Sequence, residues 1–423
     1  MINKKVIALA LASLAILIMT FILLNKGSLE ISVDRSASIK INNTGLENTQ
    51  GLKKSLAPKK YKILVSKEGY LDYEKEIEIK RWQTNKINVE LNLKPEFKKL
   101  SEEKISYPAY IDNHILALSG DKSSIYKINL SDNSIEKINT GLSYIAGAMW
   151  SPSGEAVTLN INEFEKPENL GMGDLDDNML TFWYFNIETK QLKQLSPRLD
   201  ARIWSADGKK IIYSEFGERG ITVKTWEPDT NTDKQVKDVK IDKPFFVVSS
   251  DSKKIVLYPT PDVAAINYYG ESNIYILDLE TGDLKEITND GNSFGSLWSP
   301  DDKKILYTTL PSFTPILSVM RANGDNKMIL GLNTTSAPIY KAVFSNDSKY
   351  IYAAVAKELP ENFLSNETIT KDELWKIDIE TGEKIKLTDT ELDIERMMIS
   401  KDGKLIYFVS PTNNNLYSIK IKE

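Results

Sequence analysis

One short stretch has the residue types and spacing of a serine nucleophile. Gly291–Gly295 reads Gly-Asn-Ser-Phe-Gly, the Gly-x-Ser-x-Gly pattern that places a reactive serine on a tight strand-to-helix turn. The stretch lies between Ile287-Thr288 and Trp298-Ser299, which belong to two expected strands and leave no room for a helix. The single histidine, His114, lies upstream, whereas a nucleophile of this type takes its base from downstream. We therefore expect no catalytic site at this serine.

A second stretch has the residue types of a calcium loop. Gly173–Asn178 reads Gly-Asp-Leu-Asp-Asp-Asn, with oxygen-bearing side chains at alternate positions. A complete EF-hand loop also needs Gly at its sixth position and Glu at its twelfth. Met179 and Phe185 occupy those places. We expect a solvated acidic loop at residues 173–178, with a calcium site as the alternative.

Composition excludes several other kinds of chemistry. The 423 residues include no cysteine and one histidine, so disulfides, thiolate nucleophiles and Cys- or His-rich metal centres are excluded. The formal net charge of −5 argues against a nucleic-acid partner. We predict no catalytic residue, cofactor or metal site. His114 is expected to be a surface turn residue. The alternative is a hydrolase or lyase in which acidic pairs such as Asp174 and Glu361 meet.

The elements that would position any site are built from one repeated turn. Each copy has a bulky apolar residue, a Ser, a polar turn and then a short apolar strand. Ser and Asp side chains bond to nearby backbone N–H groups in such turns, and Gly or Asn accepts positive φ. Near-regular recurrence indicates a repeat architecture. The copies begin at Trp150, Trp204, Val248, Trp298, Phe344 and Ile399.

Strand hairpins complete each repeat. Asn273–Thr288 and Leu374–Thr388 each hold two alternating runs joined by Glu-Thr-Gly, which predicts a hairpin. Four strands per unit at spacings of roughly 40 to 55 residues are typical of a β-propeller. Pro108–Leu116 adds a first unit with a shortened turn, which gives seven blades, or six if this unit is degenerate. Trp150, Trp204 and Trp298 share one repeat position, which indicates packing between blades.

The last unit lacks a fourth strand. Its third strand, Leu416–Ile421, is followed by only two residues, and Phe97–Ser101 reads like the missing strand. Pairing these two segments would close the ring and remove two exposed strand edges. We expect residues 97–101 to close the last blade, within a propeller spanning residues 95–423.

The N-terminal segment has the composition of a membrane anchor. Residues 6–24 are apolar or small, close to the ~20 residues needed to span a bilayer as a helix. Lys4 and Lys5 precede them, which predicts a cytoplasmic N-terminus and an extracytoplasmic remainder. Residues 1–27 are therefore expected to be a cytoplasmic tip and a transmembrane anchor. A cleaved secretory signal is the alternative.

Residues 28–94, between the expected anchor and the expected propeller, have the alternating pattern of a small β-sandwich. Alternating runs are expected to form strands with one packed face and one wet face. Tyr61–Val65, the turn Ser66–Tyr70 and the ending Ile87–Leu91 resemble the PEGA domain. Asp34–Ala37 replaces the tetrapeptide that names that family. The resemblance implies a non-catalytic module of the cell envelope. The alternative is a plain spacer. The expected strands are 29–33, 37–41, 61–65, 76–80 and 86–91, with a polar loop after the second.

The repeated turn resembles that of the TolB-like propeller family, whose unit reads Trp-Ser-Pro-Asp-Gly-Lys before a strand. The resemblance covers nearly all of residues 96–423, as in Trp298–Lys303. It implies a fold that occurs in protein-binding modules, in sugar-associated modules and as gates on peptidases, so it leaves the activity open.

Loops of unequal length indicate where a partner would bind. The loops between second and third strands are long at Asn162–Met179, Pro259–Ser272 and Lys357–Lys371, and short at Glu215–Gly220. These loops share one face with the loops that enter each blade, so that face is the expected recognition surface, with neutral loop variation as the alternative. Tyr268, Tyr269 and Phe363 are its aromatic candidates. We expect a protein or cell-wall polysaccharide (peptidoglycan) ligand, with a structural spacer as another alternative.

Overall fold

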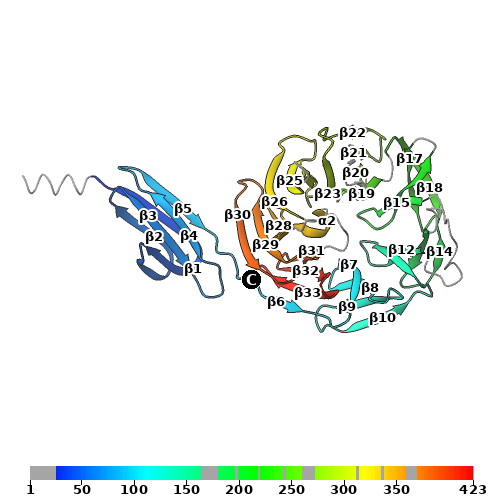
Figure 1. Ribbon diagram of the computed structural model, residues 1–423, viewed down its shortest axis with the longest axis horizontal. Helices are drawn as coiled ribbons and strands as arrows, with labels where there is room; N and C mark the ends of the chain where they lie inside the picture. Colours follow the sequence, from blue (N-terminus) through cyan, green and yellow to red (C-terminus); the bar gives the residue numbers. More distant parts are fainter. Residues whose placement is uncertain are drawn as a thin grey trace, which may run out of the picture. The chain divides into compact units, whose positions relative to one another are not determined.

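A computed structural model describes residues 25–162, 180–195, 199–217, 220–241, 244–259, 272–310, 314–334, 338–358 and 369–422. These residues form β-strands, turns and one short helix, α2 (Pro338–Lys341). The described chain divides into two compact units, with the boundary between Lys94 and Pro95 (Figure 1). The all-β class expected from the sequence is confirmed.

The expected anchor at residues 6–24 lies outside the described ranges. Within those ranges no helix is both long enough and apolar enough to cross a membrane.

The first unit is a five-stranded sheet built around one long strand. Its order is β2-β1-β3-β4, and β5 pairs with β1 in parallel. Buried apolar residues alternate along β1, from Leu29 and Ile31 to Ile39 and Ile41, and they pack with Ile63 of β3 and others into one core. The strands are β1 (Gly27–Ile41), β2 (Thr44–Leu56), β3 (Lys60–Ser66), β4 (Tyr73–Glu78) and β5 (Thr84–Val89).

Two expectations about this unit are wrong. The strands expected at 29–33 and 37–41 are one strand, β1, whose register with β2 shifts between Ser32 and Ala37. The polar loop expected after them contains β2. Asn42 and Asn43, at φ 47° and 66°, form a two-residue turn that folds β2 back onto β1. β2 is exposed along most of its length, so its sequence lacks the apolar alternation that marks a half-buried strand.

The second unit is a propeller of seven four-stranded sheets. Figure 1 draws the sheets as a ring, with α2 inside it. We number the blades in chain order and call the first strand of each blade its inner strand. The first four blades are β7 (Ile105–Ile111), β8 (His114–Ser119), β9 (Ser124–Asn129), β10 (Ile135–Asn139); β11 (Ile145–Trp150), β12 (Ala156–Asn162), β13 (Leu180–Asn186), β14 (Leu192–Gln194); β15 (Leu199–Trp204), β16 (Ile211–Gly217), β17 (Gly220–Glu227), β18 (Thr232–Val239); and β19 (Pro244–Val248), β20 (Lys254–Pro259), β21 (Tyr275–Asp278), β22 (Leu284–Glu286).

The last three blades complete the ring. The final blade takes its outer strand, β6 (Phe97–Lys99), from the start of the unit, and β6 pairs antiparallel with β33. Phe97 packs edge-on against Phe408, with ring centroids 6.2 Å apart. The strand expected to close the last blade therefore does so. These blades are β23 (Ser293–Trp298), β24 (Lys304–Thr309), β25 (Ile316–Arg321), β26 (Met328–Asn333); β27 (Ala342–Phe344), β28 (Tyr350–Ala356), β29 (Asp372–Asp378), β30 (Lys384–Asp389); and β31 (Glu395–Ile399), β32 (Leu405–Ser410), β33 (Asn415–Lys420).

The repeated serine organises the turn after the inner strand. In the fifth blade Ser299 Oγ donates to Asp301 Oδ1 at 2.7 Å and accepts from the Lys304 N–H at 2.9 Å. Ser205 makes the same pair of bonds in the third blade, and it is buried like Ser299. The serine thus satisfies a backbone donor that burial would otherwise leave without a partner.

Neighbouring turns are also bonded to each other. Ser252, at φ 60°, accepts from the Ala206 N–H of the preceding blade at 2.8 Å. Asp302, at φ 54°, accepts from the N–H and hydroxyl of Ser250 at 2.8 and 2.6 Å. Each is a non-glycine residue in a left-handed conformation. Its side chain reaches the blade before it, so the strained residue links two blades.

The three repeat tryptophans link blades through the core. Trp204 Nε1 donates to Met149 O at 3.0 Å, and Trp298 Nε1 donates to Val247 O at 3.1 Å, each across a blade boundary. Trp150 does the same with Tyr107 O at 2.6 Å. All three rings are buried. The expectation that they pack between blades is confirmed.

Candidate functional site

The candidate site begins at the entry ends of the inner strands. β7, β11, β15, β23 and β31 each shift register with the neighbouring strand near this end. Such bulges redirect a side chain out of the regular strand pattern. At this position Tyr107 has φ 50° and Arg396 has φ 52°. A left-handed non-glycine residue costs on the order of 1–3 kcal/mol and is frequent at functional sites.

Arg396 lies between two aromatic rings from two other blades. Its Cζ is 4.6 Å from the centroid of Tyr107 in the first blade and 5.0 Å from that of Tyr340 in α2. A guanidinium over an aromatic face is held electrostatically by the ring. Tyr107 is fixed in turn, because its hydroxyl donates to Ala146 O of the second blade at 2.6 Å.

The aromatic contacts continue beyond α2. Burial is the main cause of the raised pKa of Tyr258, and the electrostatic interaction with Tyr340 adds to it. Phe245 of β19 stacks on Tyr258 with centroids 5.5 Å apart, and Phe245 is 45% exposed. We call Tyr107, Arg396, Tyr340, Tyr258 and Phe245 the aromatic arc. Its members come from the first, seventh and fourth blades and from α2, which precedes the sixth blade.

The aromatic arc has the chemistry of an anion receptor. Among the described residues, none makes a hydrogen bond or an ion pair with the Arg396 guanidinium; its close contacts are the two rings, and Glu395 interacts with it electrostatically. A guanidinium carries five N–H donors in a fixed plane that matches a carboxylate or phosphate. Arg396 is half-buried, so its side chain is already ordered before a ligand arrives.

A buried ion network of Lys341, Asp372 and Asp393 holds α2, the element that carries Tyr340 of the arc. Lys341, in the last turn of α2, is 1% exposed, and its Nζ lies 3.0 Å from Asp372 Oδ2 and also contacts Asp393 Oδ1. The carboxylates have further donors, since the Ile394 N–H bonds to Asp372 at 2.7 Å and the Thr370 N–H bonds to Asp393 at 2.9 Å. Burial opposes the charge on Lys341, but the two carboxylates outweigh it and raise its pKa. The network fixes α2, and hence Tyr340.

Glu395 completes the electrostatics around Arg396. Burial raises the pKa of Glu395, and Lys341 opposes this rise. Such a carboxyl group holds its proton to higher pH than an exposed one. Arg396 also lowers this pKa, so the Glu395 carboxyl and the guanidinium beside it interact electrostatically.

A second arginine follows the bulge of another inner strand. Arg202 of β15 donates from Nε to Thr158 Oγ1 at 2.9 Å and from Nη2 to Asn160 Oδ1, and it lies over the Phe182 ring. Burial lowers its pKa to about 9. Its donors are engaged by the second blade, so we assign it to the blade interface.

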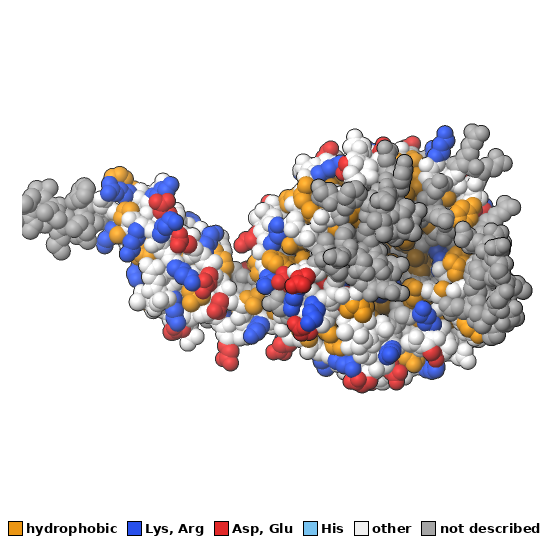
Figure 2. All heavy atoms as spheres, in the orientation of Figure 1, with side chains coloured by type: hydrophobic (Ala, Val, Ile, Leu, Met, Phe, Trp, Pro, Cys, Tyr) orange, Lys and Arg blue, Asp and Glu red, His pale blue; other side chains and the backbone are white. Residues whose placement is uncertain are grey.

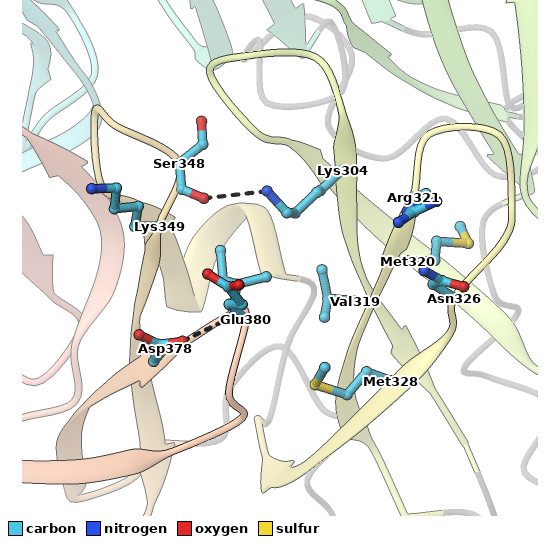
Figure 3. Close-up of a pocket in the computed structure, with 11 residues that line it drawn as sticks. Lys304, Val319, Met320, Arg321, Asn326, Met328, Ser348, Lys349, Asp378 and Glu380 are labelled. Carbon is cyan, nitrogen blue, oxygen red and sulfur yellow. Dashed lines mark hydrogen bonds between the residues drawn. The ribbon is translucent and has the colours of Figure 1, made fainter. Parts of the chain in front are cut away.

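A pocket of about 400 Å³ lies between the fifth and sixth blades (Figure 3). Its charged groups already serve the two blades. Lys304 Nζ donates to Ser348 O at 3.5 Å, and Asp378 Oδ1 accepts from the Glu380 N–H of its own hairpin at 2.9 Å. We therefore treat it as a joint between blades. Its lining also includes Arg321, Asn326 and Lys349.

The serine of the Gly-x-Ser-x-Gly stretch lies inside the fold. Ser293 is fully buried at the start of β23, and its hydroxyl donates to Asp290 Oδ1 at 2.8 Å. The expectation that His114 is a surface turn residue is wrong: it is the half-buried first residue of β8 and pairs with Ile111. No group of three or more His, Cys, Asp or Glu side chains in the described ranges is arranged to hold a metal.

The loop residues expected to form the recognition surface lie outside the described residues. This applies to the acidic stretch 173–178, to Tyr268 and Tyr269, to Phe363 and to Asp174 and Glu361.

Sequence reasoning missed Arg396, Tyr107, Tyr340 and the Lys341 network. A signal does exist four residues before each turn serine, where the inner strand enters the blade. At this position three blades have a small residue and three have a large one. A repeat position that varies this much in size indicates that its side chain has different neighbours in different blades. The residues are Gly147, Ala201, Phe245, Gly295, Lys341 and Arg396.

Comparison with known families confirms both resemblances. Residues 30–95 match the PEGA domain. The Tol-Pal system protein TolB of Francisella tularensis is 25% identical over 228 residues, which are 54% of this chain and 48% of that protein. The chain thus spans about half the length of the curated relatives it matches. It carries a PEGA domain followed by a TolB-like propeller.

Solved structures agree on the fold. An oligogalacturonate lyase from Vibrio parahaemolyticus has a TM-score of 0.54 at 10% identity, covering 78% of this chain and 98% of that one. The β-propeller domain of the Trilobed protease from Pyrococcus furiosus has a TM-score of 0.51 at 15% identity, covering 76% and 95%. That domain is described as having an open velcro topology. Here β6 pairs with β33, so the described ring is closed by strands from both ends of the unit.

Proposed function

We propose that this chain is a non-catalytic binding protein of the cell envelope. It is held by a single membrane anchor at residues 6–24, and a seven-bladed propeller binds a protein partner. The PEGA match and the similarity to a protein of the Tol-Pal system support an envelope location. The apolar run after Lys4 and Lys5 supports the anchor and its orientation.

The observation that carries the proposal is Arg396 between Tyr107 and Tyr340. A guanidinium whose donors meet no acceptor among the described residues, flanked by aromatic rings, suits an acidic side chain or a terminal carboxylate of a protein partner. The rings supply apolar contact area, and the arginine fixes the orientation. The arc lies at the entry ends of the inner strands. In the second and fourth blades the inner strand runs antiparallel to the second strand, so its entry end lies beside the start of a long loop.

A charged peptide tests this function. We expect a hexaglutamate peptide to bind the full chain in detergent, and Arg396→Ala to weaken binding at least tenfold, which corresponds to about 1.4 kcal/mol. Isothermal titration measures both. Lys349→Ala, which removes a cation from the pocket of Figure 3, is the matched control and should leave the affinity unchanged.

Two results would contradict the proposal. One is equal binding of hexaglutamate to the wild-type chain and to Arg396→Ala. The other is equal binding of hexaglutamate and hexaglutamine, because an arginine receptor requires a negative charge. Arg396→Lys separates charge from shape, and we expect it to recover only part of the affinity, since an ammonium lacks the planar fork of donors.

A further inference from the structure

Three chain segments meet at one end of the PEGA domain. Trp82 N donates to Lys26 O at 3.1 Å, and Ser28 N donates to Gln83 O at 2.8 Å, so the β4–β5 turn lies against the start of β1. Ile79 N donates to Lys59 O at 2.9 Å, which adds the β2–β3 loop. We call residues 25–27, 57–59 and 79–83 the basal tip.

The basal tip is cationic. Lys26, Lys59, Lys80 and Arg81 belong to it, and none of its three segments contains an Asp or Glu. Lys59, Lys80 and Arg81 are exposed, and Lys26 is half-buried. In Figure 2, Lys and Arg side chains lie together with apolar atoms at the end of this unit where β1 begins. Such a surface attracts anionic groups without needing a shaped pocket.

The basal tip also holds an outward-facing tryptophan. Trp82 is 78% exposed, the largest exposed fraction among the large hydrophobic residues in the described part of the chain. Its φ of 55° is a left-handed conformation that a bulky side chain adopts only under strain, and Gly or Asn would adopt it more readily. The turn therefore exposes most of a large aromatic side chain at a position suited to a small residue.

The position of the basal tip in the chain identifies its partner. The proposed anchor ends at residue 24, and Lys26, whose carbonyl binds the Trp82 N–H, follows two residues later. Anything bonded to Lys26 lies within a few ångströms of the point where that anchor would leave the bilayer, since consecutive Cα atoms are about 3.8 Å apart. Tryptophan and basic residues are the side chains enriched at the headgroup level of membranes.

We propose that the basal tip rests on the lipid headgroups, with Trp82 in the interface and the four basic residues toward anionic phosphates. The proposal rests on the anchor at residues 6–24 and extends it, because the PEGA domain then meets the membrane through a defined surface. Two attachments to one bilayer restrict the tilt of the domain more than a single flexible connection does.

Fluorescence quenching by lipid tests the contact. The full chain is reconstituted into vesicles of phosphatidylcholine and phosphatidylglycerol, with and without bromine on the upper acyl chains. The chain has seven tryptophans, and the other six lie in the propeller, so the difference between the wild type and Trp82→Asn isolates Trp82. Asn keeps the left-handed turn, so folding is preserved. We expect the wild-type emission to fall in brominated vesicles and the variant to show no such fall.

Charge reversal and a matched control sharpen the result. Lys80→Glu combined with Arg81→Glu should reduce the quenching in vesicles with phosphatidylglycerol more than in pure phosphatidylcholine. Ile329→Ala removes another exposed apolar residue, from the propeller, and should leave the quenching unchanged.

Flotation after alkaline carbonate extraction separates the two proposals. A chain that floats with the vesicles while Trp82 is unquenched, or while Trp82→Asn is quenched as strongly as the wild type, overturns the headgroup contact and keeps the anchor. A chain that is extracted from the vesicles overturns both.

Discussion

At the scale of single residues, Arg396 depends on its backbone. Its left-handed φ and the bulge of β31 turn the guanidinium away from the strand and between Tyr107 and Tyr340. Arg202 follows a similar bulge but bonds to Thr158 and Asn160. Two arginines on inner strands thus have different surroundings: a neighbouring blade engages the donors of Arg202, whereas no described residue accepts a hydrogen bond from the Arg396 guanidinium.

Glu395 gives a residue-scale test by pH. Its pKa is raised above the ordinary 4.5, chiefly by burial. Above pH 4.5 the unfolded chain has released this proton while the folded chain still holds it, so stability falls as the pH rises through the window that begins at 4.5. Glu395→Gln removes this loss. We expect the variant to have a higher thermal midpoint than the wild type at pH 7 and to lose that advantage below pH 4.5.

Scanning calorimetry across that pH range checks the Glu395 prediction. A variant that is less stable than the wild type at pH 7 would contradict it, because Glu395 would then stabilise the fold as a charged group.

At the scale of elements, the turn after each inner strand is both a local motif and a link between blades. The serine at its start bonds within the turn, and the left-handed residue near its end bonds to the blade before it. Ser252 shows the second role through its bond with the Ala206 N–H. The link explains why a strained conformation is kept at a position where three other blades have glycine.

Paired substitutions at Ser252 test this link. Ser252→Ala removes the acceptor of the Ala206 N–H and keeps the left-handed strain, so we expect a loss of about 1 kcal/mol in the free energy of unfolding. Ser252→Gly loses the same bond but relieves strain worth roughly 1 kcal/mol, so it should cost less. Denaturant unfolding followed by tryptophan fluorescence measures both. Equal losses would show that the left-handed conformation carries no penalty here.

The sequence predicts the elements that repeat and misses those that do not. The turn serines and the hairpins of the third and fourth strands recur as patterns, and the closing strand Phe97–Lys99 matches the pattern of a fourth strand, so they can be predicted without the structure. β2 is not predicted because it is exposed along most of its length, so its apolar residues do not alternate with polar ones. The aromatic arc is not predicted because its members lie far apart in the sequence and come together only when the ring closes.

At the scale of the whole propeller, closure brings these blades together. β6 and β33 pair although they lie at opposite ends of the unit, and this pairing places the first blade next to the seventh. We call this joint between the first and seventh blades the seam. Tyr107 contacts Arg396 across it, although the two residues are 289 positions apart in sequence. We expect Phe97→Ala, which removes the packing on Phe408, to destabilise the seam and so to weaken hexaglutamate binding. Phe216→Ala, at an exposed ring of the third blade, should change neither the stability nor the binding.

Thermal unfolding and peptide titration of the same samples check that coupling. A Phe97→Ala chain with a lowered thermal midpoint and wild-type affinity at low temperature would show that the seam stabilises the ring without shaping the arc.

The most direct test of the account locates the peptide on the propeller. The chain has no cysteine, so a single one can be labelled uniquely. Glu391 and Lys401 are exposed residues that precede and follow β31, the strand of Arg396, and Glu391 precedes the end of β31 that holds Arg396. We label Glu391→Cys or Lys401→Cys with a donor dye and add hexaglutamate carrying an acceptor. We expect stronger energy transfer from position 391 than from position 401, and we expect the transfer from position 391 to be lost on Arg396→Ala. Stronger transfer from position 401, or transfer from 391 that survives Arg396→Ala, would contradict it.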